Sequence, residues 1–172
     1  MNQAMNTLPA GLVSSRFDVV FPVAHGRIGE DGALQGLLEL LALPYVGSAV
    51  LASALANDKR ATKMACRAAG LPVAEGIELT VGEALTEQAA LAVTRLGTNL
   101  VVKPASQGSA IGVSLLPELT GPSDPRLVAA LTEAYEYDRH LLVEQLVRGR
   151  EITCGVLDIA GMPATALPPT EI

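Results

Sequence analysis

The stretch LVVKPASQGSAIGVSLL, residues 100–116, has the pattern of a β-hairpin joined by a loop of small residues. The β-branched and aliphatic runs at its two ends are typical of short strands. Lys103 closes the first run, the glycines after it let backbone N–H groups approach an anion, and Ser109 adds a hydroxyl donor. The pattern predicts a phosphate-binding loop; the alternative is a solvated lysine beside an ordinary hairpin turn.

The segments after this hairpin complete an α+β unit. Leucines and alanines from residue 127 to residue 134 recur at helical spacing, and Ser123, Asp124 and Pro125 precede them as a helix start. Three strands are predicted next, in LLVEQLV (141–147), EITCGVL (151–157) and PATALPPTEI (163–172).

Two further helices are predicted ahead of the hairpin. Asp58 is placed to cap the segment DKRATKMACRAAG, which presents an apolar face and ends at Gly70. Thr80 and Glu83 have the spacing of a capping box before an alanine- and leucine-rich helix that runs to Leu96.

The first part of the chain has a texture typical of an α/β fold. The run FDVVFPVA, residues 17–24, predicts a buried strand. Leucines at positions 34, 37, 38 and 41 predict a helix, and Ser48 is placed to cap a second helix that reaches Ala56. Residues 40–57 carry no charge, but proline, glycine and serine interrupt them, which favours buried core over a membrane span.

These two patterns of predicted strands and helices indicate the fold class, α/β followed by α+β. We expect a partial α/β domain over residues 1–57 and an α+β unit with a mostly antiparallel sheet over residues 58–172. The first predicted strand has no earlier strand to pair with, and no segment follows the last one. We therefore expect the chain to be a fragment of a longer protein.

Composition excludes several classes of function. Of the 172 residues 49% are hydrophobic, enough to bury a core, and the net charge of -6 without a basic stripe argues against nucleic acid as a partner. Neither GxxxxGK[ST] nor GxGxxG occurs. Cys66 and Cys154 lack metal-ligand spacing, so reduced thiols in a cytoplasmic protein are expected. The N-terminal residues 1–18 lack the pattern of a secretory signal.

Other charged residues are candidates for contacts with a nucleotide. Lys59 lies in the first turn of its predicted helix, where the macrodipole disfavours a cation; it is either an exposed lysine or a phosphate ligand beside Lys103. Glu144 and Glu151 flank a short connection, where carboxylates can accept hydrogen bonds from ribose and the backbone of residues 145–147 can contact adenine. The alternative is two solvent-facing glutamates at a hinge.

A second candidate site is the loop HGRIGEDG, residues 25–32, which follows the first predicted strand. Ligands of α/β folds bind at the carboxyl ends of strands, so His25 and Glu30 are candidates for holding an amino-acid substrate. The alternative is that they cap the next helix, as Asp31 is also placed to do. His140 begins a strand without an acidic partner in register and is interpreted as structural.

Taken together, these segments resemble the D-alanine:D-alanine ligase family of the ATP-grasp superfamily. The resemblance extends from Asp18 to Ile172. It is carried by HGRIGEDGALQGLLELLALPYVGS, SALANDKRATK, AAGLPV, VVKPASQGSAIGVS and LLVEQLVRGREIT, in that order and spacing. The KP motif with its Gly/Ser loop is shared by ATP-grasp proteins generally, whereas the HGxxGEDGxxQG block is particular to this family.

The resemblance implies roles for individual residues. It places Lys59 and Lys103 on the ATP phosphates, Ser109 in a catalytic loop that faces both substrates, and His25 and Glu30 near the first D-alanine. It also implies an adenine and ribose site formed by Glu144, Gln145, Leu146, Val147 and Glu151. The family loop usually reads GSS; here Ala110 replaces the second serine, which removes one hydroxyl but leaves the backbone donors.

The resemblance further implies ATP-dependent joining of two D-alanine molecules through an acyl phosphate, for peptidoglycan and cell-wall synthesis in the cytoplasm. Magnesium or manganese ions are implied, with ligands beyond Ile172 and none in this chain, and the full-length protein is expected to form a homodimer without a membrane partner. This chain alone is expected to bind nucleotide without ligase turnover. The alternatives are another ATP-grasp carboxylate:amine ligase, or a truncated, non-catalytic nucleotide-binding paralogue.

Overall fold

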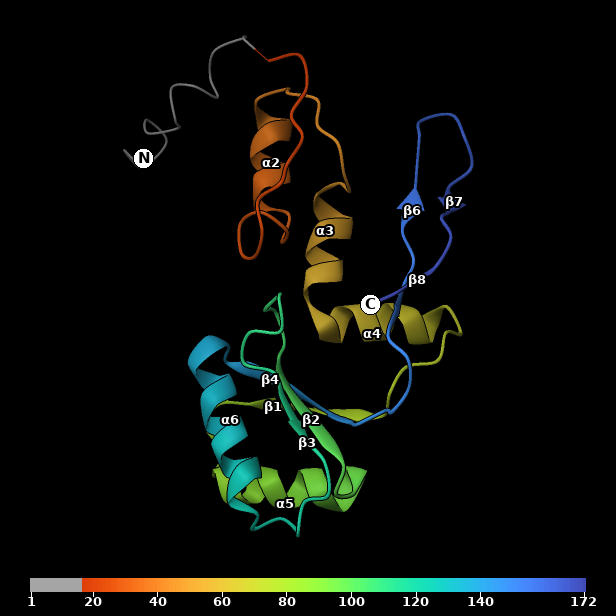
Figure 1. The fold of residues 1–172 in the computed structure, drawn as a ribbon. Helices are drawn as coiled ribbons and strands as arrows, with labels where there is room; N and C mark the ends of the chain where they lie inside the picture. The colour runs from red at the N-terminus through yellow and green to blue at the C-terminus, as the bar shows by residue number, and fades with distance from the viewer. Residues whose placement is uncertain (1–16) are drawn as a thin grey trace, which may run out of the picture.

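The computed structural model describes residues 17–172, and Figure 1 shows their arrangement. An N-terminal part, residues 17–57, holds helices α2 (Ala33–Leu40) and α3 (Val50–Asn57). Helix α4 (Lys59–Ala68) lies between this part and a sheet unit that occupies residues 76–145. The predicted α/β to α+β boundary at residue 57 coincides with the end of α3, but no further observation tests it and it remains a prediction.

The sheet unit contains a four-stranded antiparallel sheet with strand order β1-β4-β2-β3. Its strands are β1 (Gly76–Thr80), β2 (Leu100–Pro104), β3 (Ser114–Leu116) and β4 (His140–Gln145). The predicted hairpin is confirmed, since β2 and β3 pair antiparallel with Leu100 opposite Leu116. Strand β1 was not among the elements expected from the sequence.

Helices α5 (Leu85–Leu96) and α6 (Pro125–Tyr137) cover one face of this sheet (Figure 1). They pack a core of aliphatic side chains against the strands, among them Leu100, Leu127, Leu131, Leu141 and Val143, each fully buried. Burial of a leucine contributes about 1.5–3 kcal/mol relative to exposure, so this core is the principal source of stability of the unit.

The helix starts test the capping predictions. Asp58 accepts hydrogen bonds from Arg60 N and Ala61 N, so the predicted cap is confirmed. The predicted helix start at residues 123–125 is also confirmed, with Asp124 as the N-cap that accepts a hydrogen bond from Arg126 N. The predicted capping box at Thr80 is wrong. Thr80 ends β1 and α5 begins five residues later without a side-chain cap, because pairing with β4 holds the backbone of Thr80 extended opposite His140.

The N-terminal part departs from two expectations. Residues 17–24 do not form a buried strand: Val20 makes a single parallel bridge to Tyr45, and Phe21 is 69% exposed. Both predicted helices form, but residues 40–57 are not buried core, since Leu40 and Leu51 lie largely exposed. Among residues 17–57 no named strand extends this bridge into a sheet, so the apolar run at residues 17–24 has no sheet in which to be buried.

Two smaller details of this region also differ. Ser48 does not cap α3 through its side chain; its carbonyl accepts a hydrogen bond from the Ser53 hydroxyl, and Ala49 occupies the N-cap position. Within residues 17–172 no helix is both long enough and apolar enough to span a membrane. The prediction about a signal sequence falls largely on residues 1–16, which lie outside the described residues.

The last part of the chain forms short ribbons. Strand β5 (Ile152–Thr153) pairs with β8 (Thr170–Glu171), and β6 (Val156–Leu157) pairs with β7 (Thr165–Ala166), each antiparallel. The three strands predicted after α6 are therefore one long strand, β4, and these two narrow ribbons. Their side chains are exposed, and Figure 1 shows the ribbons standing apart from the sheet unit.

Candidate functional site

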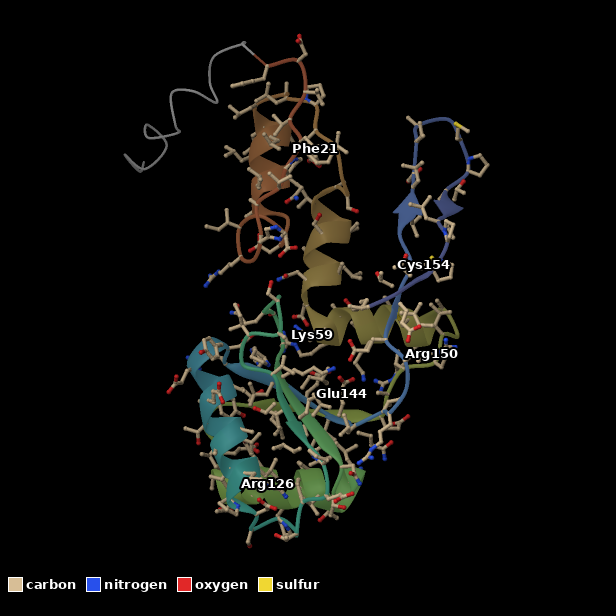
Figure 2. All side chains as sticks on the ribbon, in the orientation of Figure 1. Phe21, Lys59, Arg126, Glu144, Arg150 and Cys154 are labelled. Carbon is tan, nitrogen blue, oxygen red and sulfur yellow. The ribbon has the colours of Figure 1, made fainter. Side chains whose placement is uncertain are left out.

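The site is built from the lysines of the chain. The sequence contains three, Lys59, Lys63 and Lys103, and all of them meet between α4 and the sheet. Lys59 and Lys63 lie one helical turn apart on α4, while Lys103 comes from β2. Figure 2 shows Lys59 and Glu144 facing the same space between α4 and the sheet, far from Arg126 at the opposite end of the unit. An acidic chain thus gathers all three of its lysine ammonium groups in one place.

Glu144 is the anionic centre of this cluster. Its side chain is 8% exposed; Oε1 accepts a hydrogen bond from Lys63 Nζ, and Oε2 accepts one from Lys103 Nζ at 2.6 Å. Burial alone would raise the pKa of Glu144, but the hydrogen bonds from Lys103 and Lys63 outweigh it and hold the pKa below its usual range. The carboxylate is therefore kept ionised.

Lys59 has a different environment. Its ammonium donates a hydrogen bond to the carbonyl of Gln107 in the glycine-rich loop, and its backbone N–H donates to Ala105 O at 2.9 Å. Burial lowers the pKa of Lys59, and the positive charge of Lys103 lowers it further. A cation held against burial and against a like charge is stabilised by a bound anion.

A cavity of about 890 Å³ opens beside these lysines. It is lined on one side by Lys59, Lys103 and the loop residue Ser109, and on the other by His25 and Glu30. The structure thus brings together both candidate sites that the sequence indicated separately. Lys63 and Glu144 are not among the lining residues and lie behind Lys103.

Glu30 is held close to the glycine-rich loop. Its Oε2 accepts a hydrogen bond from Gly26 N at 2.6 Å, so the carboxylate closes its own loop. A Cβ atom built on Gly108 would lie 3.5 Å from the same oxygen, which places the carboxylate beside the loop backbone. Glu30 and Gly108, about 80 positions apart in the sequence, therefore lie beside each other at the same site.

The loop between β2 and β3 is tightly turned. Ser109 and Ala110 both adopt left-handed backbone angles, with φ of 50° and 57°, and Gly112 follows at 66°. Such angles are uncommon for residues with a Cβ atom and are typical of functional loops that expose backbone N–H groups. Ala110, the departure from the family loop, lines the cavity together with Ser109.

The residues expected to contact adenine and ribose lie outside this cavity. The N–H groups of Gln145 and Leu146 are occupied, donating to Glu75 O and Asn99 O at 2.9 Å each. Val147 is 72% exposed, and Glu151 is exposed as well. Among the backbone donors of residues 145–147, Val147 N–H has no partner recorded within residues 17–172.

Lys63 is the residue that the sequence analysis missed. Its position four residues after Lys59 places both ammonium groups on the same face of α4, which was a usable signal. Its partner, Glu144, lies 81 positions away in the sequence, so no local sequence pattern indicates the ion pair.

The described residues around the cavity do not fit a divalent metal ion. Within residues 17–172 no group of three or more His, Cys, Asp or Glu side chains converges on one point. The cavity wall presents one carboxylate, that of Glu30, among ammonium groups and neutral side chains, whereas magnesium requires several oxygen ligands, chiefly carboxylates. We therefore assign no metal ligand to the described residues.

The fold and the site together define a class of protein, that of ATP-grasp architecture, in which helices and an antiparallel sheet present lysines and a glycine-rich loop to one cavity. Residues 65–172 match the family described as D-ala D-ala ligase C-terminus, and residues 2–48 match D-ala D-ala ligase N-terminus. The chain belongs to the D-alanine:D-alanine ligase family.

Individual relatives agree with this assignment. D-alanine--D-alanine ligase A of Chromobacterium violaceum is 48% identical over 143 residues, which cover 83% of this chain and 38% of the relative. The ligase A of Escherichia coli K12 is 46% identical over 140 residues, which cover 81% of this chain and 37% of the relative.

Solved structures give the same result. The D-alanine-D-alanine ligase from Coxiella burnetii superposes with a TM-score of 0.77 at 42% identity, covering 90% of this chain and 44% of that one. The VanG D-Ala:D-Ser ligase from Enterococcus faecalis superposes with a TM-score of 0.75 at 35% identity, covering 90% and 43%. The chain thus spans less than half the length of the relatives it matches.

Proposed function

We propose that this chain supplies the triphosphate-binding half of an ATP-dependent ligase that joins two D-alanine molecules. The observation that carries the proposal is the convergence of all three lysines of an acidic chain beside a glycine-rich loop and a cavity. Lys63 and Lys103 share one ion-paired carboxylate, that of Glu144, and within residues 17–172 the Lys59 ammonium forms no ion pair, so positive charge exceeds the carboxylate charge in direct contact with it. This excess suits a polyphosphate, which carries several negative charges.

Within this proposal the two walls of the cavity have separate tasks. Lys59 and Lys103 neutralise phosphate oxygens, and the backbone of the loop at Ser109 donates hydrogen bonds to them. His25 and Glu30, on the opposite wall, orient the first amino acid, with the Glu30 carboxylate as a partner for its ammonium group. The chain-borne residues thus bind and position the two reactants against each other.

The proposed chemistry proceeds in two steps. The carboxylate of the first D-alanine attacks the γ-phosphate and forms an acyl phosphate, with ADP as the leaving group. The amine of the second D-alanine then attacks the acyl carbon, inorganic phosphate leaves, and the peptide bond is formed. Lys59 and Lys103 stabilise negative charge on the transferred phosphoryl group in the first step.

For the adenosine half of the nucleotide we propose fewer contact groups than the sequence indicated. Because the N–H groups of Gln145 and Leu146 are occupied by backbone hydrogen bonds, we propose that Val147 N–H and the carbonyls of residues 145–147 contact adenine. The exposed Glu151 is available to a ribose hydroxyl, while Glu144 contributes through its lysine partners.

The first test is isothermal titration of the chain with ATP. We expect saturable binding that is lost in Lys103→Ala and retained in Arg95→Ala, which removes an exposed cation from α5 on the far side of the sheet. Equal binding by wild type and Lys103→Ala would exclude the lysine cluster as the nucleotide site. Equal losses of ATP affinity in the two variants would show that binding depends on the net charge of the chain and not on the position of Lys103.

The wider activity belongs to the whole protein. We propose D-alanine as both substrates because the curated relatives carry that name, and the VanG D-Ala:D-Ser ligase neighbour makes D-serine the competitor to test. Phosphate release by the full-length protein that depends on D-alanine alone supports the first choice, and a requirement for D-serine supports the second. We extend the proposal to a cytoplasmic homodimer acting in cell-wall synthesis, which sedimentation of the full-length protein tests for the assembly.

A further inference from the structure

Lys63 differs from the other two lysines in what it faces. Its side chain is only 11% exposed, it does not line the cavity, and its ammonium donates hydrogen bonds to Glu144 Oε1 and to the carbonyl of Ala74. Lys59 and Lys103, by contrast, both line the cavity. Lys63 therefore cannot reach a ligand in the cavity without leaving Ala74 and the buried Glu144 carboxylate.

Glu144 would neutralise the charge of Lys103 if Lys63 were not also paired with it. Lys103 Nζ lies 2.6 Å from Glu144 Oε2, so the two groups form a close ion pair at the cavity wall. An isolated pair of this kind has no net charge, and its attraction for an anion falls off much faster with distance than that of a free cation. With Lys63 on the other carboxylate oxygen, the group of three carries one net positive charge.

We propose that Lys63 is a positioning residue for polyphosphate binding: it neutralises Glu144 from behind and so leaves the charge of Lys103 available to the ligand. This inference rests on the proposed function. Lys63 acts through Glu144 and touches no substrate. When a polyphosphate draws Lys103 towards the cavity, Lys63 stays paired with Glu144. The buried carboxylate is then not left as an unpaired charge, which would be strongly unfavourable.

A purely structural role would be to fasten α4 to the sheet, since Lys63 links the helix to Ala74 and Glu144. The two roles predict opposite responses when Glu144 is also neutralised. If Lys63 only fastens the helix, removing the carboxylate loosens α4 further and binding stays weak. If Lys63 balances charge, removing the carboxylate frees Lys103 and binding recovers.

The experiment is isothermal titration of the 172-residue chain with inorganic tripolyphosphate, which has no adenine or ribose and so reports the phosphate contacts alone. We expect Lys63→Met to weaken binding about tenfold, the effect of one unit charge near the protein surface. Lys63→Arg restores the charge and is expected to stay within about threefold of wild type. The matched control is Arg67→Met, which removes an exposed charge from the next turn of α4 and is expected to change little.

The decisive variant is Lys63→Met combined with Glu144→Gln, which we expect to bind tripolyphosphate at least fivefold more tightly than Lys63→Met alone, by recovering one net charge. Glu144→Gln by itself is expected to bind more tightly than wild type, and this variant carries the test if Lys63→Met does not fold. No change in Lys63→Met, or no recovery in the double variant, would overturn the inference while leaving the proposed function intact. Failure of the wild-type chain to bind tripolyphosphate would overturn both.

Discussion

Gly112 shows at the scale of one residue how tightly the glycine-rich loop is packed. Its φ is +66°, and a Cβ atom there would lie 2.7 Å from a ring carbon of Tyr137 and 2.8 Å from Pro104. We expect Gly112→Ala to lower the free energy of unfolding by about 2–4 kcal/mol, from left-handed strain and overpacking together. A urea titration measures the loss.

Gly70 provides the matched control for that change. Its φ is +72°, but a Cβ atom there would have no neighbour within 4 Å. Gly70→Ala therefore isolates the backbone strain and is expected to cost about 1 kcal/mol. Equal losses at Gly70 and Gly112 would show that steric contact with Tyr137 contributes nothing to the shape of the loop.

The pH dependence of ligand binding is also a property of one residue, Lys59. Its pKa lies below the ordinary value of 10.5 because of burial and the charge of Lys103, although Asp138, Asp58 and Glu144 oppose the shift. An anion binds the charged form, so the contribution of Lys59 is complete below its pKa and is lost as the pH rises through it. We expect tripolyphosphate affinity to begin falling at a pH below 10.5.

Replacing Lys59 by arginine separates this residue from the other titrating groups. The guanidinium stays charged throughout the range, so Lys59→Arg should retain affinity at the pH where wild type begins to lose it. Titration calorimetry at successive pH values provides the comparison. Identical profiles for the two proteins would assign the alkaline loss of affinity to a group other than Lys59.

At the scale of elements, α4 depends on its ends more than on its packing. None of its side chains is fully buried, whereas Asp58 accepts hydrogen bonds from Arg60 N at 2.9 Å and Ala61 N at 3.3 Å and forms an ion pair with the Arg60 guanidinium. We expect Asp58→Ala to cost about 1 kcal/mol of stability and to weaken tripolyphosphate binding by displacing the lysines of the helix. Asp58→Asn keeps an acceptor and should retain both; if it instead behaves like Asp58→Ala, the ion pair and not the cap fixes the helix.

The same contrast explains which elements the sequence predicts. The caps at Asp58 and Asp124 and the hairpin at residues 100–116 depend on contacts within a few positions, so their patterns are complete in the local sequence. Burial of residues 17–24 depends on which other segments cover them, and β1 depends on a partner about 65 positions away. Neither condition is written in the segment itself.

The candidate site follows the same rule. Lys103 and Ser109 are marked by their own loop, and His25 and Glu30 by theirs, so sequence reasoning could propose all four as site residues, and all four line the cavity. What it could not provide was the distance between the two loops, because that is set by α3, α4 and the sheet together. The pairing of Lys63 with Glu144 was missed for the same physical reason.

At the scale of the whole molecule, burial is unevenly distributed. Leu38 is the one fully buried large aliphatic side chain within residues 17–57, whereas the sheet unit holds a continuous cluster of leucines and valines. Local opening requires the loss of few contacts in the first region and of many in the second. We expect backbone amides of β2 and β4 to exchange with deuterium at the slowest rates, and those of α2 and α3 to exchange much faster, as mass spectrometry of the exchanging chain would measure.

Ligand binding should reduce that difference, because the two regions are joined at the site. Asn57 Nδ2 donates to Ser106 O at 3.3 Å, and Lys59 links the start of α4 to Gln107, so a polyphosphate held by this loop also holds the end of α3. We expect tripolyphosphate to slow exchange at residues 105–113 and in α3 together, and to leave the distant α5 unchanged. Protection confined to the loop would mean that the N-terminal part moves independently of the phosphate site, and uniform protection before ligand addition would contradict the uneven distribution of stability from which both expectations derive.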